Sequence, residues 1–223
     1  MQNRGGHFIV AIDGPAGSGK STVSKLIAAK LGLLYIDTGA MYRALTLKAV
    51  RQGMDLEDGD ALTKLARNTK IDLRNVSGSL KVFLDDEDVS GFIRTPELTN
   101  NVKFIARVPG VRREMVNLQR IIGGRSSAVL EGRDIGTVVF PDARFKFYLD
   151  ADVEERSRRR HKELLETDQN AHLGDIKKDV MKRDESDMNR AAGALKKAPD
   201  AVLIDTTGLS IEEVTEKLLS YMK

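Results

Sequence analysis

Short apolar runs alternate with longer amphipathic segments along most of the chain. Five of these runs are rich in branched or aromatic residues and are too short for helices: residues 8–12, 33–36, 128–130, 145–149 and 201–204. Each run is continuous rather than alternating, which is typical of strands buried on both faces of a parallel sheet. The pattern therefore predicts a doubly wound α/β sheet of five strands with helices between them.

Two of the intervening helices carry end signals. Residues 20–31 repeat apolar positions at helical spacing and stop before Gly32, and glycine is common just past a helix end. Near the end of the chain, Ser210 and Glu213 have the spacing of a capping box, and apolar positions of helical period follow them. We expect helices at both places.

The region from about residue 60 to 127 is too long for a simple crossover between two strands. Within it, residues 71–73 and 80–84 alternate around Ser77-Gly78, which predicts an antiparallel hairpin with its turn there. Thr95-Pro96 has the form of a helix cap followed by the first helical residue. These signals predict an inserted subdomain with its own small sheet.

Residues 153–190 are highly charged and poor in large apolar side chains. Such a segment contributes little to a hydrophobic core, since charged residues are seldom fully buried. We expect it to form a mobile, solvated lid.

Composition narrows the protein class. The chain has 223 residues, of which 41% are hydrophobic and 31% charged, so disorder and low complexity are excluded. It has no cysteine, which excludes disulfides, thiolate zinc sites and cysteine nucleophiles, and its three histidines show no metal-ligand spacing. No apolar run approaches about 18 residues, and the first run is too short for a signal peptide. We expect a soluble, cytoplasmic protein.

The strongest motif matches the phosphate-binding pattern G-x-x-x-x-G-K-[ST]. It comprises Gly14, Pro15, Ala16, Gly17, Ser18, Gly19, Lys20, Ser21 and Thr22. Its glycines let backbone N–H groups face a polyphosphate, with Lys20 at the β and γ phosphates and the Ser21 hydroxyl on Mg²⁺. An ordinary glycine-rich turn is the alternative, but a predicted strand precedes this motif and a predicted helix follows it.

A phosphate-binding loop indicates a nucleotide without specifying the reaction. GTPases need a guanine-reading Asn-Lys-x-Asp segment, which this chain lacks. Motor and helicase ATPases are usually longer and carry further motifs. A compact chain with a charged lid favours a small-molecule kinase, in which closure excludes water from the reaction.

Polar residues follow the second and third predicted strands, where ligands of open parallel sheets bind. After the second strand, Thr38 and Arg43 could hold a phosphate or a base edge, although Thr38 could instead be a helix N-cap. After the third strand come Glu131, Arg133 and Asp134, which suit an active site or a structural ion pair. Glu131 stands where a carboxylate can orient magnesium-bound water.

Two further groups of charged residues have helical spacing. The first is Arg156, Arg159 and Arg160, and the second is Arg183, Asp187 and Arg190. Members of each group would share one helix face. A solvated charged face is the usual meaning of such groups. Beside a phosphate-binding loop, we expect them instead to supply cations over the γ-phosphate.

Several segments together resemble the bacterial cytidylate (CMP/dCMP) kinase family. They are Ile12-Asp13-Gly14-Pro15, residues 37–43, 88–95 and 131–143, and Arg183-Asp184 through Asn189-Arg190. The resemblance covers nearly the whole chain in the family's order. It implies a P-loop NTPase fold: a five-stranded parallel sheet flanked by helices, an inserted NMP-binding domain with a small antiparallel sheet, and a short lid.

The resemblance also implies a division of the chain. The core comprises residues 1–62 with the P-loop, 128–152 and 191–223. The NMP-binding domain with its insert comprises residues 63–127, and the lid with its flanking helices comprises residues 153–190.

The same resemblance assigns the substrate site. The residues expected to line the CMP site are Thr38, Arg43, Arg112, Arg133, Asp134, Asp187 and Arg190. Lys103 stands where the family often has a serine that contacts cytosine, and we expect its ammonium to reach the cytosine carbonyl instead. Ala194-Leu195 replaces a frequent Pro-Leu. The residues expected to act in catalysis are Lys20, Arg133, Arg156 and Arg183.

The expected reaction is transfer of the γ-phosphoryl group of ATP, bound with Mg²⁺, to CMP or dCMP. We expect a monomer with no nucleic-acid or membrane partner. Three alternatives remain open: a kinase for another acceptor such as AMP or shikimate, a nucleotide switch without turnover, and an RNA- or ribosome-associated protein. The last is suggested by an isoelectric point near 9.0 and by the arginines of residues 156–160.

Overall fold

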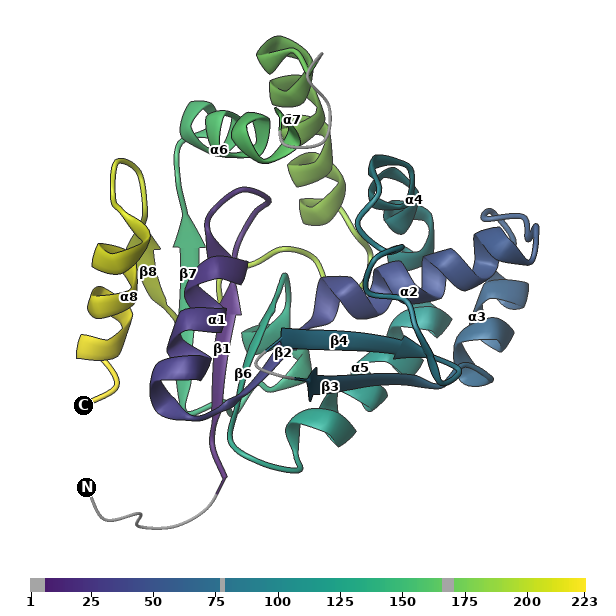
Figure 1. The fold of residues 1–223 in the computed structure, drawn as a ribbon, viewed down its shortest axis with the longest axis horizontal. Helices are drawn as coiled ribbons and strands as arrows, with labels where there is room; N and C mark the ends of the chain where they lie inside the picture. Colours follow the sequence, from purple (N-terminus) through teal and green to yellow (C-terminus); the bar gives the residue numbers. More distant parts are fainter. Residues whose placement is uncertain (1–6, 77–78, 166–170) are drawn as a thin grey trace. The chain divides into compact units, whose positions relative to one another are not determined.

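The computed structural model describes residues 7–76, 79–165 and 171–223 (Figure 1). The chain divides into two compact units. The first comprises Met1–Leu34 and Ser126–Lys223, and the second comprises Tyr35–Arg125. This division reflects compactness alone, so the functional division into core, NMP-binding domain and lid stays a prediction.

The main sheet contains all five predicted strands, and the predicted α/β fold is confirmed. The strands are β1 (Ile9–Asp13), β2 (Leu34–Asp37), β6 (Ala128–Gly132), β7 (Phe145–Asp150) and β8 (Val202–Asp205), in the order β2-β6-β1-β7-β8. The pairings of β1 with β6 and β7, and of β7 with β8, are parallel. The central strand β1 is buried on both faces, which explains its unbroken apolar run: Val10, Ala11 and Ile12 are each 0% exposed.

The helices of the first unit are α1 (Lys20–Leu31), the short π-helical turn η1 (Ile135–Val139), α6 (Val153–Leu165), α7 (Leu173–Met188) and α8 (Ile211–Ser220). Both predicted helix signals are confirmed. Gly32 ends α1 in the left-handed conformation, with φ 65°. Ser210 and Glu213 form the capping box of α8. The helices therefore begin and end where local chemistry satisfies their terminal N–H and C=O groups.

Helices α6 and α7 lie beyond the carboxyl ends of β1 and β7 (Figure 1). About half of their residues are exposed, as expected for a charged segment, but Ile176 and Val180 of α7 are buried, and the two helices pack against each other. The expectation that Arg190 continues the face of this helix is wrong. Helix α7 ends at Met188 with Asn189 as its C-cap, and Arg190 follows in irregular chain.

The second unit holds α2 (Thr38–Arg51), α3 (Gly59–Arg67), β3 (Ile71–Val76), β4 (Ser79–Leu84), β5 (Glu87–Asp88), α4 (Pro96–Ala106) and α5 (Pro109–Gly123). The predicted hairpin is confirmed by the antiparallel pairing of β3 with β4. Its expected turn at Ser77-Gly78 lies outside the described residues. Helix α4 begins as predicted, with Thr95 Oγ1 accepting the Leu98 N–H at 3.3 Å.

Strand β5 extends the small sheet to three strands, an addition that the alternation pattern did not predict. It follows a tight turn in which Asp85 and Asp86 have positive φ angles of 48° and 71°. Aspartate tolerates this conformation better than most residues. Among the described helices, none is both long and apolar enough to span a membrane.

Candidate active site

The loop between β1 and α1 is shaped by three glycines. Gly14, Gly17 and Gly19 have φ angles of 148°, 76° and 85°, which side chains of other residues rarely allow. A Cβ on Gly14 would lie 2.0 Å from the carbonyl oxygen of Leu149, and one on Gly17 would lie 2.8 Å from that of Arg156. The loop is therefore a cradle of bare backbone, suited to binding phosphate through its N–H groups.

Lys20 is buried at the floor of this cradle. Its side-chain ammonium donates to the carbonyl oxygen of Pro15 at 2.5 Å and to the hydroxyl of Ser18 at 3.2 Å. Burial, together with the nearby Arg133 guanidinium, lowers the pKa of Lys20 to about 7. A bound anion would raise this pKa and hold Lys20 in its charged form. The cradle is thus prepared for a polyphosphate.

Two oxygen groups that suit Mg²⁺ lie beside the cradle. The Ser21 hydroxyl donates to Glu131 Oε2 at 2.8 Å, and Glu131 is buried near the carboxyl end of β6. No group of three or more acidic, histidine or cysteine side chains is placed for a metal among the described residues. Mg²⁺ usually takes few protein ligands and completes its shell with phosphates and water, so this donor set fits it.

A second cluster of the first unit surrounds Asp187, which is 2% exposed. Arg133 Nε donates to Asp187 Oδ2 at 2.6 Å, and Arg190 donates to the other carboxylate oxygen. Burial alone would raise the pKa of Asp187, but Arg133 and Arg190 hold it below its usual value. Arg183 also influences the pKa of Lys20 and of Asp187, so it lies near both. The structure brings these four predicted residues together, and two of them, Arg133 and Arg183, also lie near Lys20.

Arg156 is buried and in contact with the phosphate-binding loop. Its Nη1 donates to Asp184 Oδ2 at 2.5 Å and to the carbonyl oxygen of Ala16 at 3.2 Å, and its Nε donates to the carbonyl oxygen of Ala151 at 2.8 Å. Arg156 therefore ties α6 and α7 to the loop. Its catalytic role stays a prediction.

Arg156, Arg159 and Arg160 lie on α6 at the spacing of one helix face, as expected, but they have different partners. Their supply of cations over the γ-phosphate stays a prediction. Arg159 donates to the hydroxyl of Thr206 at 2.9 Å and to its carbonyl oxygen at 2.6 Å, whereas Arg160 pairs with Glu163 at 2.9 Å. The three guanidinium groups therefore have three different partners.

In the second unit, Asp37 organises the start of α2. Its Oδ1 accepts the Ala40 N–H at 2.8 Å, so Asp37 is the N-cap and Thr38 is the first helical residue. The alternative that Thr38 caps the helix is therefore wrong. Asp37 Oδ2 also pairs with Arg43 at 3.1 Å and with Arg94 at 3.7 Å. Arg94 was not among the predicted site residues, although its segment carried part of the family resemblance.

Arg112 and Lys103 occupy different surroundings in the second unit. Arg112 is 4% exposed, donates to the carbonyl oxygen of Ala106 at 3.3 Å, and has its guanidinium carbon 5.8 Å from the ring centroid of Tyr42. It is therefore close to the helix that carries Arg43. Lys103 is exposed, and its ammonium lies 5.0 Å from the ring centroid of Phe104.

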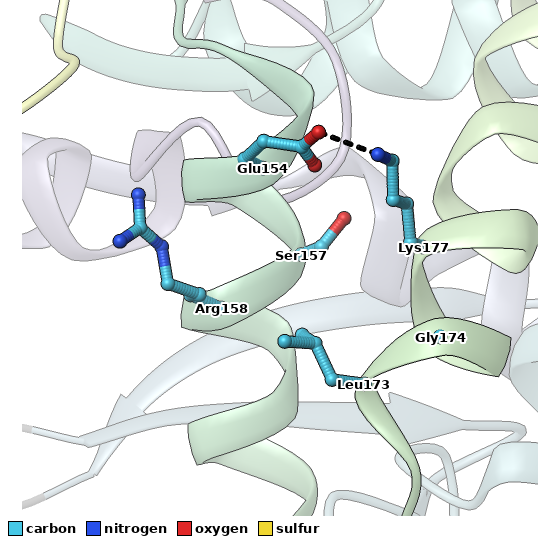
Figure 2. A pocket seen from close by; sticks show the side chains of 6 residues that line it. All are labelled: Glu154, Ser157, Arg158, Leu173, Gly174 and Lys177. Carbon is cyan, nitrogen blue, oxygen red and sulfur yellow. Dashed lines mark hydrogen bonds and ion pairs between the residues drawn. The ribbon is translucent and has the colours of Figure 1, made fainter.

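A cavity of about 470 Å³ opens between α6 and α7 (Figure 2). It is lined by Glu154, Ser157, Arg158, Leu173, Gly174 and Lys177. The carboxylate of Glu154 on α6 pairs with the ammonium of Lys177 on α7 at 2.5 Å. None of the predicted site residues lines this cavity, so the candidate nucleotide site lies elsewhere, at the glycine-rich loop.

Comparison with known proteins identifies the family. The cytidylate kinase family model matches residues 10–223. The chain belongs to the cytidylate kinase family. A cytidylate kinase of Desulforamulus reducens is 50% identical over 218 residues, covering 97% of each chain. That of Clostridioides difficile is 47% identical over 215 residues, covering 96% of this chain and 98% of the relative. The predicted family membership is confirmed.

Solved structures agree with this family at the level of the fold. A gluconokinase from Sinorhizobium meliloti aligns over 98% of this chain and 92% of its own, with TM-score 0.51 and 14% identity. An uncharacterized protein from Eubacterium ventriosum aligns over 97% of this chain and 98% of its own, with TM-score 0.53 and 12% identity. This likeness concerns architecture alone, because the identities are low. It is consistent with the predicted P-loop fold of a cytidylate kinase.

Proposed function

We propose that the chain transfers the γ-phosphoryl group of ATP to CMP or dCMP, giving ADP and CDP or dCDP, in pyrimidine nucleotide metabolism. One observation carries the proposal: a glycine cradle with a buried lysine, in a chain that matches the cytidylate kinase family over residues 10–223. ATP is the phosphoryl donor. We further propose a cytoplasmic monomer without nucleic-acid or membrane partners.

The donor is bound by the glycine-rich loop of residues 14–22. Backbone N–H groups and Lys20 hold the phosphates, while the oxygen atoms of Ser21 and Glu131 hold Mg²⁺. When bound, Mg²⁺ neutralises charge on the phosphate oxygens. Lys20 leaves its present acceptors, Pro15 and Ser18, to reach the β and γ phosphates. This exchange keeps the ammonium hydrogen-bonded throughout.

The acceptor is assigned to charged and polar residues that the family resemblance selects. We assign its phosphate to Arg43, Arg112 and Arg133, and its sugar and base to Asp134, Asp187 and Arg190, with Thr38 and Lys103 as further contacts. The attacking atom is already an anionic phosphate oxygen, so no general base is required. Catalysis then rests on alignment and on charge stabilisation. Arg156 and Arg183 neutralise charge that spreads over the transferred group.

A panel of nucleoside and deoxynucleoside monophosphates with ATP tests the function. ADP release that depends on CMP or dCMP supports the proposal and excludes a switch without turnover. Preference for AMP or shikimate would identify a different kinase. Binding to RNA that falls steeply with salt would support the RNA-associated alternative. Light scattering of the purified protein tests the monomer.

The enzyme is expected to prefer CMP over UMP. Cytosine presents an amino donor where uracil presents a carbonyl acceptor, and a buried carboxylate such as Asp134 or Asp187 suits only the donor. An unpaired buried group costs roughly 1–3 kcal/mol, so kcat/KM should favour CMP about ten- to a hundred-fold. Equal kcat/KM for the two acceptors in steady-state assays would contradict the assignment of these carboxylates to the base.

Arg190→Met is expected to raise KM for both CMP and dCMP without a comparable rise for ATP. Arg190 pairs with buried Asp187, and its side chain is 10% exposed. Losing a charge-assisted contact should lower kcat/KM about ten- to a hundred-fold. Methionine keeps much of the stem, so packing changes little.

The matched control is Arg158→Met. Arg158 lies on α6, its side chain is 64% exposed, and its partner is Glu155. This variant should keep both KM values, because exposed ion pairs contribute little. If Arg190→Met raised only the KM for ATP, Arg190 would belong to the donor side and the division of arginines above would be wrong.

A further inference from the structure

Asp13 is a buried carboxylate that none of the assignments above uses. It is the last residue of β1, directly before the first glycine of the phosphate-binding loop, and is 4% exposed. A carboxylate in such a place is costly unless each oxygen is hydrogen-bonded. Its partners therefore indicate what it does.

Both oxygens of Asp13 accept backbone N–H groups from one distant segment. Oδ1 accepts the Ile135 N–H at 2.8 Å, and Oδ2 accepts the Gly136 N–H at 2.8 Å. These are the first two residues of η1, whose opening N–H groups have no partner within the helix. Asp13 thus caps a helix that starts more than a hundred residues later in the chain.

The residue in the usual capping position does not perform this task. Asp134 directly precedes η1 in the described chain, and its side chain makes no capping hydrogen bond to it. Asp134 and its neighbour Arg133 are the two acceptor residues assigned at the end of β6. Their backbone is fixed on one side by the pairing of β6 with β1 and on the other by the contacts of Asp13 with η1.

The second N–H donor belongs to a glycine in tight surroundings. A Cβ on Gly136 would lie 3.4 Å from Asp13 Oδ2 and 3.3 Å from the Lys146 side chain. Burial raises the pKa of Asp13 to about 6, and nearby Asp134 adds to this rise. The two N–H groups and Lys20 act in the opposite direction and lower the pKa. At neutral pH the carboxylate is still mainly ionised, so both oxygens remain available as acceptors.

We propose that Asp13 is a positioning residue for the acceptor: by capping η1 from β1, it holds Arg133 and Asp134 in the orientation that binds the nucleoside monophosphate. This inference rests on the proposed function, since it concerns the same acceptor. Asp13 itself touches no substrate. It links the strand that begins the donor loop to the turn that carries two acceptor residues.

Asp13→Asn tests the proposal with almost no change in volume. The amide has one acceptor oxygen, so one of the two N–H groups loses its partner and faces an amide NH₂ group. We expect KM for CMP to rise about ten- to a hundred-fold, with KM for ATP changed by less than about twofold. Asp13→Glu should act in the same direction, because it keeps the charge near Lys20 but displaces the carboxylate.

Asp58→Asn is the matched control. Asp58 also caps a helix, α3, but a single oxygen, Oδ1, accepts both the Asp60 and Ala61 N–H groups, at 3.1 and 2.9 Å. Asparagine can keep both bonds, and Asp58 is exposed. Both KM values should stay at the wild-type level.

Amide hydrogen exchange gives a second readout, in the wild-type protein and in the variant. In the wild-type protein the Ile135 and Gly136 amides should exchange slowly, and CMP should slow them further while ATP alone does not, because binding and capping are linked. Asp13→Asn should speed the exchange of these amides. Thermal unfolding of each variant confirms that it is folded.

Three results would overturn the proposal. They are equal rises of KM for CMP and ATP, unchanged kinetics in Asp13→Asn, and rapid exchange of the two amides in the wild-type protein. The first would mean that Asp13 acts through the donor loop. If the wild-type protein did not phosphorylate CMP, the proposed function would fail, while the exchange rates would still decide whether Asp13 caps η1.

Discussion

Lys20→Ala is expected to yield a folded protein with almost no phosphoryl transfer. Lys20 is the only lysine in the motif, and its buried ammonium lies at the floor of the glycine cradle. Removing a preorganised cation from the transferring phosphates should lower kcat by on the order of a thousandfold or more. Release of ADP, measured with saturating CMP, checks this loss.

The fold should survive this substitution. Burial lowers the pKa of Lys20 to about 7, so a charged Lys20 costs the folded protein stability at neutral pH, and its removal should not unfold the chain. Lys30→Ala is the matched control on the same helix, since its side chain is 50% exposed and pairs with Glu216. Lys30→Ala should keep wild-type turnover. Near-normal turnover by folded Lys20→Ala protein would contradict the assignment of the phosphate-binding loop.

Gly14→Ala is expected to cause the largest loss of stability among the glycine substitutions of the loop. The added Cβ would lie 2.0 Å from the Leu149 carbonyl oxygen, at a φ of 148° that alanine rarely adopts. Backbone strain and overpacking together should cost roughly 2–6 kcal/mol in free energy of unfolding. Since whole domains are stabilised by only about 5–15 kcal/mol, this is a severe effect.

Gly32→Ala separates strain from steric overlap. Gly32 also has a positive φ, 65°, but apart from its own chain neighbours no atom of the described residues lies within 4 Å of where an added Cβ would stand. Gly32→Ala should lower the free energy of unfolding by only about 1–2 kcal/mol. Denaturant titration of both variants measures the difference. Equal losses would show that the close approach of Gly14 to β7 has no energetic weight.

Local patterns predicted the elements because each pattern has a local cause. The run at β1 is unbroken because the strand is covered on both faces, and α1 stops where Gly32 takes a left-handed conformation. The hairpin of β3 and β4 followed from alternation. The end of α7 carried only a weak signal, Asn189. The spacing of Arg183, Asp187 and Arg190 predicted that the helix continues to Arg190, but it ends at Met188, with Asn189 as its C-cap.

The contacts of the site depend on residues far apart in the chain, so spacing alone could not predict them. Asp13 and Ile135 are 122 positions apart, and only the pairing of β1 with β6 brings them together. The pairing of Arg156 with Asp184 could not be predicted from spacing either, because Asp184 lies 28 positions away on another helix. The family resemblance named the residue types of the site but not these partners.

Helix α7 carries the counter-ions of two arginines that belong to different parts of the proposed site. Asp184 is the counter-ion of Arg156, which touches the donor loop, and Asp187 is the counter-ion of Arg133, which follows β6. Three residues along a helix correspond to about 4.5 Å of rise, so both anions belong to one rigid turn. In the proposed function, displacing Arg156 toward a phosphate would remove the ion-pair partner of Asp184, whereas Asp187 would keep Arg190 as a partner if Arg133 moved. If the two sites bind phosphate as proposed, this turn of α7 places the counter-ion of a donor-side arginine one turn from that of an acceptor-side arginine.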